Sequence, residues 1–156
     1  MRASELNVRI NIKGYQMNTL YRDNAYKLFE KQIKCLIMDD RESQMKLYSD
    51  DLRYEFPFAN DRPRLIESKE SFRKIMEPLW AEARQKGIRV VDCDSEFHAT
   101  DEQDLFLAIF DLKVKVAENQ VVLPFVQILR IKDDFIVSVK EYFNSPARNA
   151  AIKSVK

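Results

Sequence analysis

The chain has 156 residues, the usual length of one domain, of which 46% are hydrophobic and 33% charged. This composition is typical of a globular protein and not of a disordered one. The 26 lysines and arginines are balanced by 25 aspartates and glutamates, so bulk electrostatics give no reason to expect a nucleic-acid partner. No apolar run approaches the ~20 residues of a membrane span, and we expect no membrane partner.

Cysteine, histidine and glycine are all scarce, which excludes several kinds of site. The chain has two cysteines, Cys35 and Cys93, and one histidine, too few for a metal site built from thiolates and imidazoles, so we expect no metal. Its two glycines exclude a phosphate-binding P-loop and a dinucleotide-binding loop, and we expect no cofactor. The lack of a disulfide framework and of a secretory signal favours a cytoplasmic location.

The first half of the chain is predicted to be mainly helical. Residues 1–18 show no clear period and are interpreted as an N-terminal arm, which leaves 19–156 as a single domain. Apolar spacings of three and four predict a helix over 19–38. Further elements are expected in this order: a short helix over 41–48 capped by Asp40, a strand over 52–58, and a helix from Ser68 to about residue 86 with a kink or break near Pro78.

Four strands are predicted in the second half of the chain. They cover residues 88–99, 105–117, 120–132 and 135–143, and the turns between them are short. Turns of this length make consecutive strands antiparallel neighbours. Helices segregated from an antiparallel sheet give an α+β domain. Strands this long can bend around a helix and form an open cone with an internal pocket.

The last strand contains a candidate acid-base residue. Strict alternation places Glu141 in one row with Val139 and Phe143, and residues 136, 138, 140 and 142 on the other face. If the apolar row faces a cavity, burial of the carboxylate raises its pKa, which suits a general acid or base near neutral pH. The alternatives are a solvated carboxylate at a strand end and a partner for a nearby arginine.

Two other polar residues interrupt apolar strand faces. Asp111 follows Leu105, Leu107 and Ile109 on one face and precedes two lysines, so it is either a catalytic carboxylate or a residue at the rim. Gln127 lies among apolar residues of its strand, where a buried amide needs partners and could orient a ligand. The stretch Arg62-Pro63-Arg64 is a small basic loop, too short to predict a phosphate site.

Aromatic and aliphatic residues supply the expected pocket wall and an outer face. Each wall candidate could equally belong to the core; they are Tyr26, Phe29, Phe56, Trp80, Phe110 and Val139. Apolar residues on the opposite sheet face, among them Val122, Val126, Ile128 and Ile136, imply a covering partner. We therefore expect a homodimer that buries this face.

Five stretches in the right order carry a resemblance to a known family. They are MDDRESQMKLYSDDL at 38–52, YEFPF at 54–58, LIESKESF at 65–72, FVQILRIKDD at 125–134 and KEYFN at 140–144. Together with the order of the elements, these stretches resemble the nuclear-transport-factor-two-like superfamily. Within it the chain is most similar to SnoaL-like polyketide cyclases, ketosteroid isomerases and phenazine-biosynthesis A/B proteins.

The resemblance implies a cone-shaped α+β barrel in which a bent sheet wraps around helices and encloses a pocket. It also implies a homodimer. Glu141 matches the position of an acid-base glutamate in phenazine A/B-type proteins, Asp111 falls near a carboxylic acid of isomerase-like members, and Gln127 falls where some members have a polar pocket residue. The pocket histidine of phenazine-type members and the Asp–His pair of the cyclases have no match in this chain.

Two functions follow as expectations. The first is a cofactor-free isomerase, cyclase or dehydratase that acts on a small apolar or ring-containing ligand through a buried carboxylate. The alternative is a non-catalytic ligand-binding or interaction module on the same fold, since this fold carries both kinds of protein.

Overall fold

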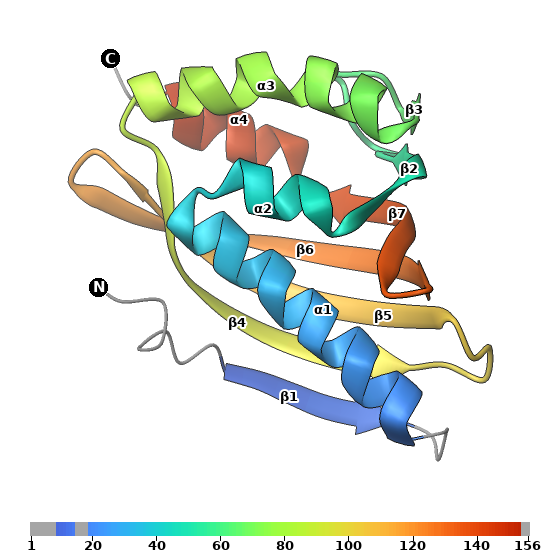
Figure 1. Ribbon diagram of the computed structural model, residues 1–156. Helices are drawn as coiled ribbons and strands as arrows, with labels where there is room; N and C mark the ends of the chain where they lie inside the picture. The colour runs from blue at the N-terminus through green and yellow to red at the C-terminus, as the bar shows by residue number, and fades with distance from the viewer. Residues whose placement is uncertain (1–8, 15–18, 154–156) are drawn as a thin grey trace.

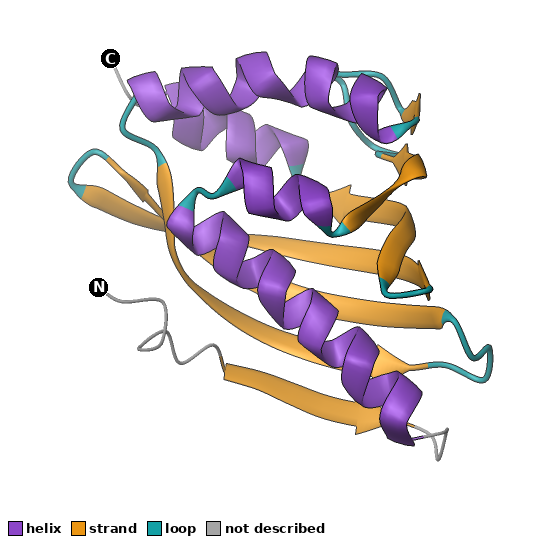
Figure 2. Cartoon of the chain, in the orientation of Figure 1, coloured by secondary structure: helices purple, strands orange, loops and turns teal. Residues whose placement is uncertain are grey.

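In the computed structural model, which describes residues 9–14 and 19–153, a curled seven-stranded sheet wraps around a long helix (Figure 1). The sheet has the strand order β1-β4-β5-β6-β7-β2-β3. The elements are β1 (Arg9–Gly14), α1 (Thr19–Met38), α2 (Arg41–Lys46), β2 (Tyr48–Glu55), β3 (Leu65–Glu67), α3 (Lys69–Gln85), β4 (Arg89–Ala99), β5 (Leu105–Val116), β6 (Asn119–Lys132), β7 (Phe135–Phe143) and α4 (Ser145–Lys153). Helix α1 crosses the concave face of the sheet, and α3 and α4 lie together at one end (Figure 2). None of the described helices has the length and apolar character needed to cross a membrane.

The α+β fold class and the four-stranded antiparallel meander are confirmed. Strands β4 to β7 pair consecutively and antiparallel, as the short turns predicted. The sheet is nevertheless mixed, because β1 runs parallel to β4 and β2 runs parallel to β7. Strands β1 and β2 thus join the two edges of the meander from distant parts of the chain. Short turns in the sequence indicate only the pairing of consecutive strands, so they do not predict these two pairings.

Three elements were not predicted from the sequence. Arg9–Gly14, within the expected arm, forms β1 and pairs with residues 94–99; the rest of residues 1–18 lies outside the described part. The three-residue β3 and the C-terminal α4 were also missed. Two boundaries were wrong as well: the short helix ends at Lys46, and the strand after it starts at Tyr48, not at Leu52. Helix α3 continues through Pro78, so the expected break does not occur.

A bulge changes the phase of β7. Ile131 pairs with Ile136 and Arg130 pairs with Ser138, which leaves Val137 as an extra residue. Ile136 is therefore buried, whereas strict alternation placed it on the outer face. After the bulge, Val139 and Phe143 face inward as expected, and the Glu141 side chain lies between them in the same row.

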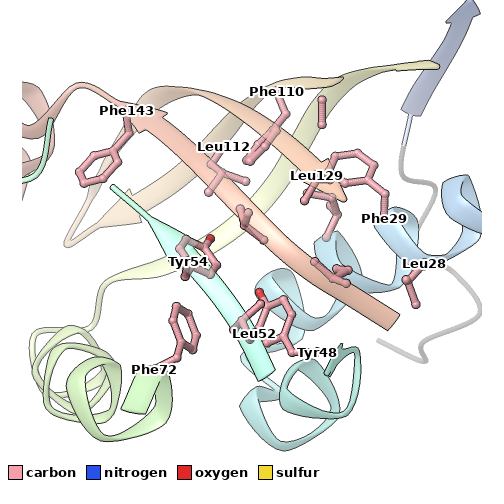
Figure 3. Close-up of a cluster of buried hydrophobic side chains, with 14 of the residues drawn as sticks. Leu28, Phe29, Tyr48, Leu52, Tyr54, Phe72, Phe110, Leu112, Leu129 and Phe143 are labelled. Carbon is pink, nitrogen blue, oxygen red and sulfur yellow. The ribbon is translucent and has the colours of Figure 1, made fainter. Parts of the chain in front are cut away.

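The core is an aromatic cluster between α1 and the concave face of the sheet (Figure 3). Phe29 of α1 stacks on Phe97 of β4 with ring centroids 5.2 Å apart, and Phe97 stacks in turn on Phe106 of β5. Phe29 and Val139 are fully enclosed in this core, with exposed fractions of 0% and 1%. Burial of a side chain such as Phe29 contributes about 1.5–3 kcal/mol to folding.

Ser68 begins helix α3 in a strained backbone conformation. Its φ of 79° and ψ of 145° lie close to a region that glycine alone adopts readily, at a cost of about 1–3 kcal/mol for other residues. Its hydroxyl compensates in part by accepting a hydrogen bond from the Ser71 N–H at 3.1 Å as the N-cap.

We predict that Ser68→Gly stabilises the protein by roughly 1 kcal/mol, since relief of strain exceeds the few tenths lost when glycine replaces serine at an N-cap. Urea unfolding followed by circular dichroism measures the change. Ser68→Ala is the control: it keeps the strain and loses the cap, so it is expected to destabilise. A Gly variant no more stable than the wild type would contradict the prediction.

Candidate functional site

A cavity of about 210 Å³ lies between α3 and the concave face of the sheet. Its wall is mainly apolar, with Leu112 and Val114 from β5, Leu123 from β6, and Phe72 and Trp80 from α3. Eleven polar side chains complete the lining, and three of them, Gln127, Glu141 and Tyr54, are joined by hydrogen bonds. The others are Gln32, Asp39, Arg41, Gln44, Arg62, Arg84, Arg89 and Arg148. An apolar space with a few convergent polar groups is the usual form of a small-molecule site.

One carboxylate oxygen of Glu141 is fixed by two hydrogen bonds. Glu141 is the cross-strand partner of Gln127 in the β6–β7 register, so the two side chains lie on the same face of the sheet. Its Oε1 accepts a hydrogen bond from Gln127 Nε2 at 2.6 Å and another from the Tyr54 hydroxyl at 3.0 Å. No described residue donates a hydrogen bond to Oε2, and Glu141 lines the cavity. One oxygen is thus held and the other is available to a ligand.

A chain of side-chain hydrogen bonds fixes the orientation of Gln127. Arg41 Nη1 donates to Gln44 Oε1 at 2.9 Å, and Gln44 Nε2 donates to the Tyr48 hydroxyl at 3.1 Å. The Tyr48 hydroxyl donates to Gln32 Oε1 at 3.3 Å, and Gln32 Nε2 donates to Gln127 Oε1 at 2.8 Å.

Every donor in this chain points toward Glu141. A guanidinium only donates and a carboxylate only accepts, so the two ends fix the direction of the amides between them. Gln127 therefore presents its N–H, and not its carbonyl oxygen, to Glu141.

The carboxyl of Glu141 has a raised pKa. Burial is the largest cause, because it disfavours the ionised form; the hydrogen bonds from Gln127 and Tyr54 and the charges of Arg62 and Arg148 oppose it. Burial, followed by the negative charge of Glu141, also raises the pKa of the Tyr54 phenol well above its usual value. Tyr54 therefore remains a hydrogen-bond donor across the neutral range.

A guanidinium in the loop after β2 forms a second polar group of the lining. The Arg62 side chain is only 4% exposed, and it donates to both carboxylate oxygens of Asp61 at 2.9 and 3.0 Å. Its guanidinium lies over the rings of Phe56 and Phe143 at 4.9 and 5.4 Å. Arg148 of α4 also donates to Asp61, at 2.6 Å.

The structure brings together only part of the set expected from the sequence. Glu141, Gln127, Phe56, Trp80 and Phe110 line the cavity. The other expected residues lie elsewhere: Phe29 and Val139 belong to the core, and Tyr26 packs edge-on against Phe97.

Asp111 is exposed on the outer face of β5. The interpretation of Asp111 as a catalytic carboxylate is therefore wrong for this cavity, because Asp111 does not line it. The prediction grouped Asp111 correctly with Leu105, Leu107 and Ile109, but the interior of β5 is the other face, which carries Phe106, Ala108 and Phe110.

Several residues of this site were missed. Gln32 could have been found, since it is a polar residue on the buried face of α1, next to Phe29 and Ile33. The placement of Arg62 depends on how its loop folds back over Phe143, for which no local pattern exists.

Cysteine and metal chemistry find no support in the described residues. Cys35 and Cys93 are unpaired and buried, and burial, followed by the charges of Asp92 and Asp94, raises the pKa of the Cys93 thiol to about 12. Cys93 is thus an unreactive thiol at neutral pH. The described part of the chain contains no group of three His, Cys, Asp or Glu residues placed to hold a metal ion.

Comparisons with known proteins identify the fold. A "putative isomerase" from Bacillus subtilis superimposes with a TM-score of 0.73 at 19% identity, over 90% of this chain and 100% of that one. A "putative polyketide cyclase" from Xanthomonas campestris pv. campestris has a TM-score of 0.63 at 15% identity, over 85% and 98% of the two chains. A phenazine biosynthesis-related protein from Pseudomonas aeruginosa has a TM-score of 0.60 at 14% identity, over 90% and 88%.

The chain has a SnoaL-like, nuclear-transport-factor-two-like fold. No protein-family model and no curated protein matches the sequence. At these identities the likeness establishes the fold alone and leaves the chemistry to the site itself.

The raised pKa of Glu141 predicts a pH-dependent effect of Glu141→Gln on stability. The ionised carboxylate is disfavoured in the folded state, so the stability that the protonated form provides is lost as pH rises through the folded pKa. The variant, which keeps an oxygen for Gln127 and Tyr54, should gain stability relative to the wild type as pH rises from the ordinary glutamate pKa through the raised pKa of the folded state. The gain is about 1.4 kcal/mol for each pKa unit by which folding raises the value.

Urea titrations of both proteins at several pH values measure this difference. A stability difference that falls as pH rises would show that folding lowers the pKa of Glu141, and would contradict the prediction.

Proposed function

We propose that the protein is a small-molecule enzyme of the isomerase or cyclase kind, in which Glu141 transfers a proton next to a ligand carbonyl. The observation that carries the proposal is the state of this carboxylate: Oε1 is held by Gln127 and Tyr54, Oε2 has no described partner, and burial raises the pKa. A carboxylate whose pKa is nearer neutral is a stronger base, and it can still release the proton again near neutral pH.

The proposed step moves one proton and no other atom. Oε2 of ionised Glu141 removes a proton from the carbon next to the carbonyl. The electron pair of the C–H bond forms a C=C bond, and the carbonyl π pair moves to oxygen, which gives an enolate and neutral Glu141. In an isomerisation the ligand is a β,γ-unsaturated ketone, and neutral Glu141 returns the proton to the γ carbon of the dienolate. In a cyclisation the enolate carbon attacks a second carbonyl carbon of the same ligand, the π pair of that carbonyl moves to its oxygen, and this oxygen takes the proton back from Glu141.

The proposal predicts catalysed deuterium exchange at such a carbon. We choose 2-tetralone in D₂O as the probe, because it is a two-ring ketone with exchangeable protons next to the carbonyl. Proton NMR should show exchange accelerated by the wild type, and Glu141→Gln should reduce the acceleration by about 10²–10⁴-fold, the usual contribution of one acid-base group.

Glu67→Gln is the matched control, since Glu67 is 74% exposed on β3 and does not line the cavity. Equal exchange rates in the two variants would contradict the catalytic proposal. Binding of 2-tetralone without accelerated exchange would favour the non-catalytic binding module.

We also propose that the protein is a homodimer that buries the outer face of the sheet. Ile109 of β5 and Val122 of β6 are 43% and 54% exposed on this face, beside the partly buried Val126 and Ile128. Exposed aliphatic residues on adjacent strands suit a self-complementary contact about a two-fold axis.

Light scattering at micromolar concentration should give the mass of two chains for the wild type and of one chain for Val122→Glu. Leu65→Glu, a change at a similarly exposed residue on β3 (42% exposed), should leave the dimer intact. A monomeric wild type would contradict this proposal.

A further inference from the structure

We propose that Arg62 is the electrophilic group of this pocket: its Nη1 donates a hydrogen bond to the carbonyl oxygen of the ligand from which Glu141 removes a proton. This inference rests on the proposed function and adds the group that the function needs. An enolate forming in a mainly apolar cavity requires a hydrogen-bond donor aimed at its oxygen, and proton removal by Glu141 alone does not provide one.

The hydrogen-bond inventory of Arg62 leaves donors unused. A guanidinium has five N–H bonds. The Nε–H and one Nη2–H go to Asp61, and one Nη1–H goes to the Met76 sulfur at 3.5 Å. A thioether is a weak acceptor, so this buried cation has one poor partner and two N–H bonds without an acceptor among the described residues.

These donors are held in place before a ligand arrives. The Asp61 carboxylate holds one edge of the guanidinium, and the guanidinium lies over the rings of Phe56 and Phe143. Both Arg62 and Met76 line the cavity. Methionine is unbranched and flexible, so a carbonyl oxygen can take the place of the Met76 sulfur with little disturbance of the wall.

The charges around the cavity suit an oxyanion. Arginines predominate among its charged lining residues, since Arg41, Arg62, Arg84, Arg89 and Arg148 outnumber Asp39 and Glu141. Asp61, beside Arg62 and Arg148, offsets one of these positive charges. When Glu141 takes a proton, the net positive charge rises by one, at the moment when the ligand oxygen gains its negative charge. The positive charge of Arg62 already acts on Glu141, where it lowers the pKa against the effect of burial.

Arg64, two positions after Arg62, is the matched control residue. Arg64 belongs to the same loop but is exposed and does not line the cavity.

We use 4-nitrophenol as the probe because its phenolate, an analogue of an enolate, has its own visible absorbance. Nitrobenzene is the neutral analogue. All measurements are made in the Glu141→Gln background, so that the probe meets no carboxylate at that position and the result does not depend on Glu141 chemistry.

In this background the bound probe should ionise at lower pH than the free probe. Adding Arg62→Gln should remove this shift and weaken phenolate binding by at least tenfold, while nitrobenzene affinity changes less than twofold. Adding Arg64→Gln should change neither. If Arg62→Gln does not fold, Arg62→Lys is compared instead: it keeps the charge beside Asp61 but loses the fork of N–H bonds, and phenolate affinity should still fall.

Equal phenolate binding with and without Arg62 would overturn the inference and leave the proposed function standing. Arg62-dependent phenolate binding without Glu141-dependent exchange of 2-tetralone would overturn the proposed function alone. If neither 2-tetralone nor 4-nitrophenol binds to any variant, both the proposed function and the role of Arg62 are overturned.

Discussion

One extra residue in β7 decides which side chains face the cavity. Ile136 enters the core directly after the β6–β7 turn, and strict alternation from that point would turn Lys140 and Tyr142 inward and Glu141 outward. The bulge at Val137 inserts one residue into the count and reverses this phase. Glu141 thereby becomes the inward partner of Gln127, and its hydrogen bonds with Gln127 and Tyr54 depend on that register.

A buried carboxylate is costly unless it is hydrogen-bonded, and the fold meets this cost with neutral donors. Gln127 and Tyr54 stabilise the ionised form without adding a permanent positive charge beside it, whereas a direct arginine contact would lower the pKa by 1–3 units, as is typical of close ion pairs. Arg62 and Arg148 share the carboxylate of Asp61. Their effect on Glu141 is therefore partial, and its pKa remains raised.

Local patterns predicted the first three helices and the meander, but not α4 or the assembly of the site. The periodicity of α1 and the short turns between β4 and β7 are local signals, and both gave the correct elements. The parallel strands β1 and β2 join the sheet through long-range pairing, and the face of β5 that becomes interior depends on that packing. Glu141 and Gln127 could be predicted because each interrupts an apolar row. Arg62 lies in a loop with no period, and only the tertiary structure places it over Phe143.

The size of the cavity restricts what the fold relationship can imply. About 210 Å³ exceeds the ~150 Å³ of an engineered cavity that holds benzene, but it is less than the ~300–1,000 Å³ of most ligand pockets. The space is therefore sufficient for a ring or a compact pair of rings. Resemblance to proteins named as polyketide cyclases thus extends to the scaffold. The compact ketone of the proposed function is consistent with the cavity, because the wall is mainly apolar and both Glu141 and Arg62 line it.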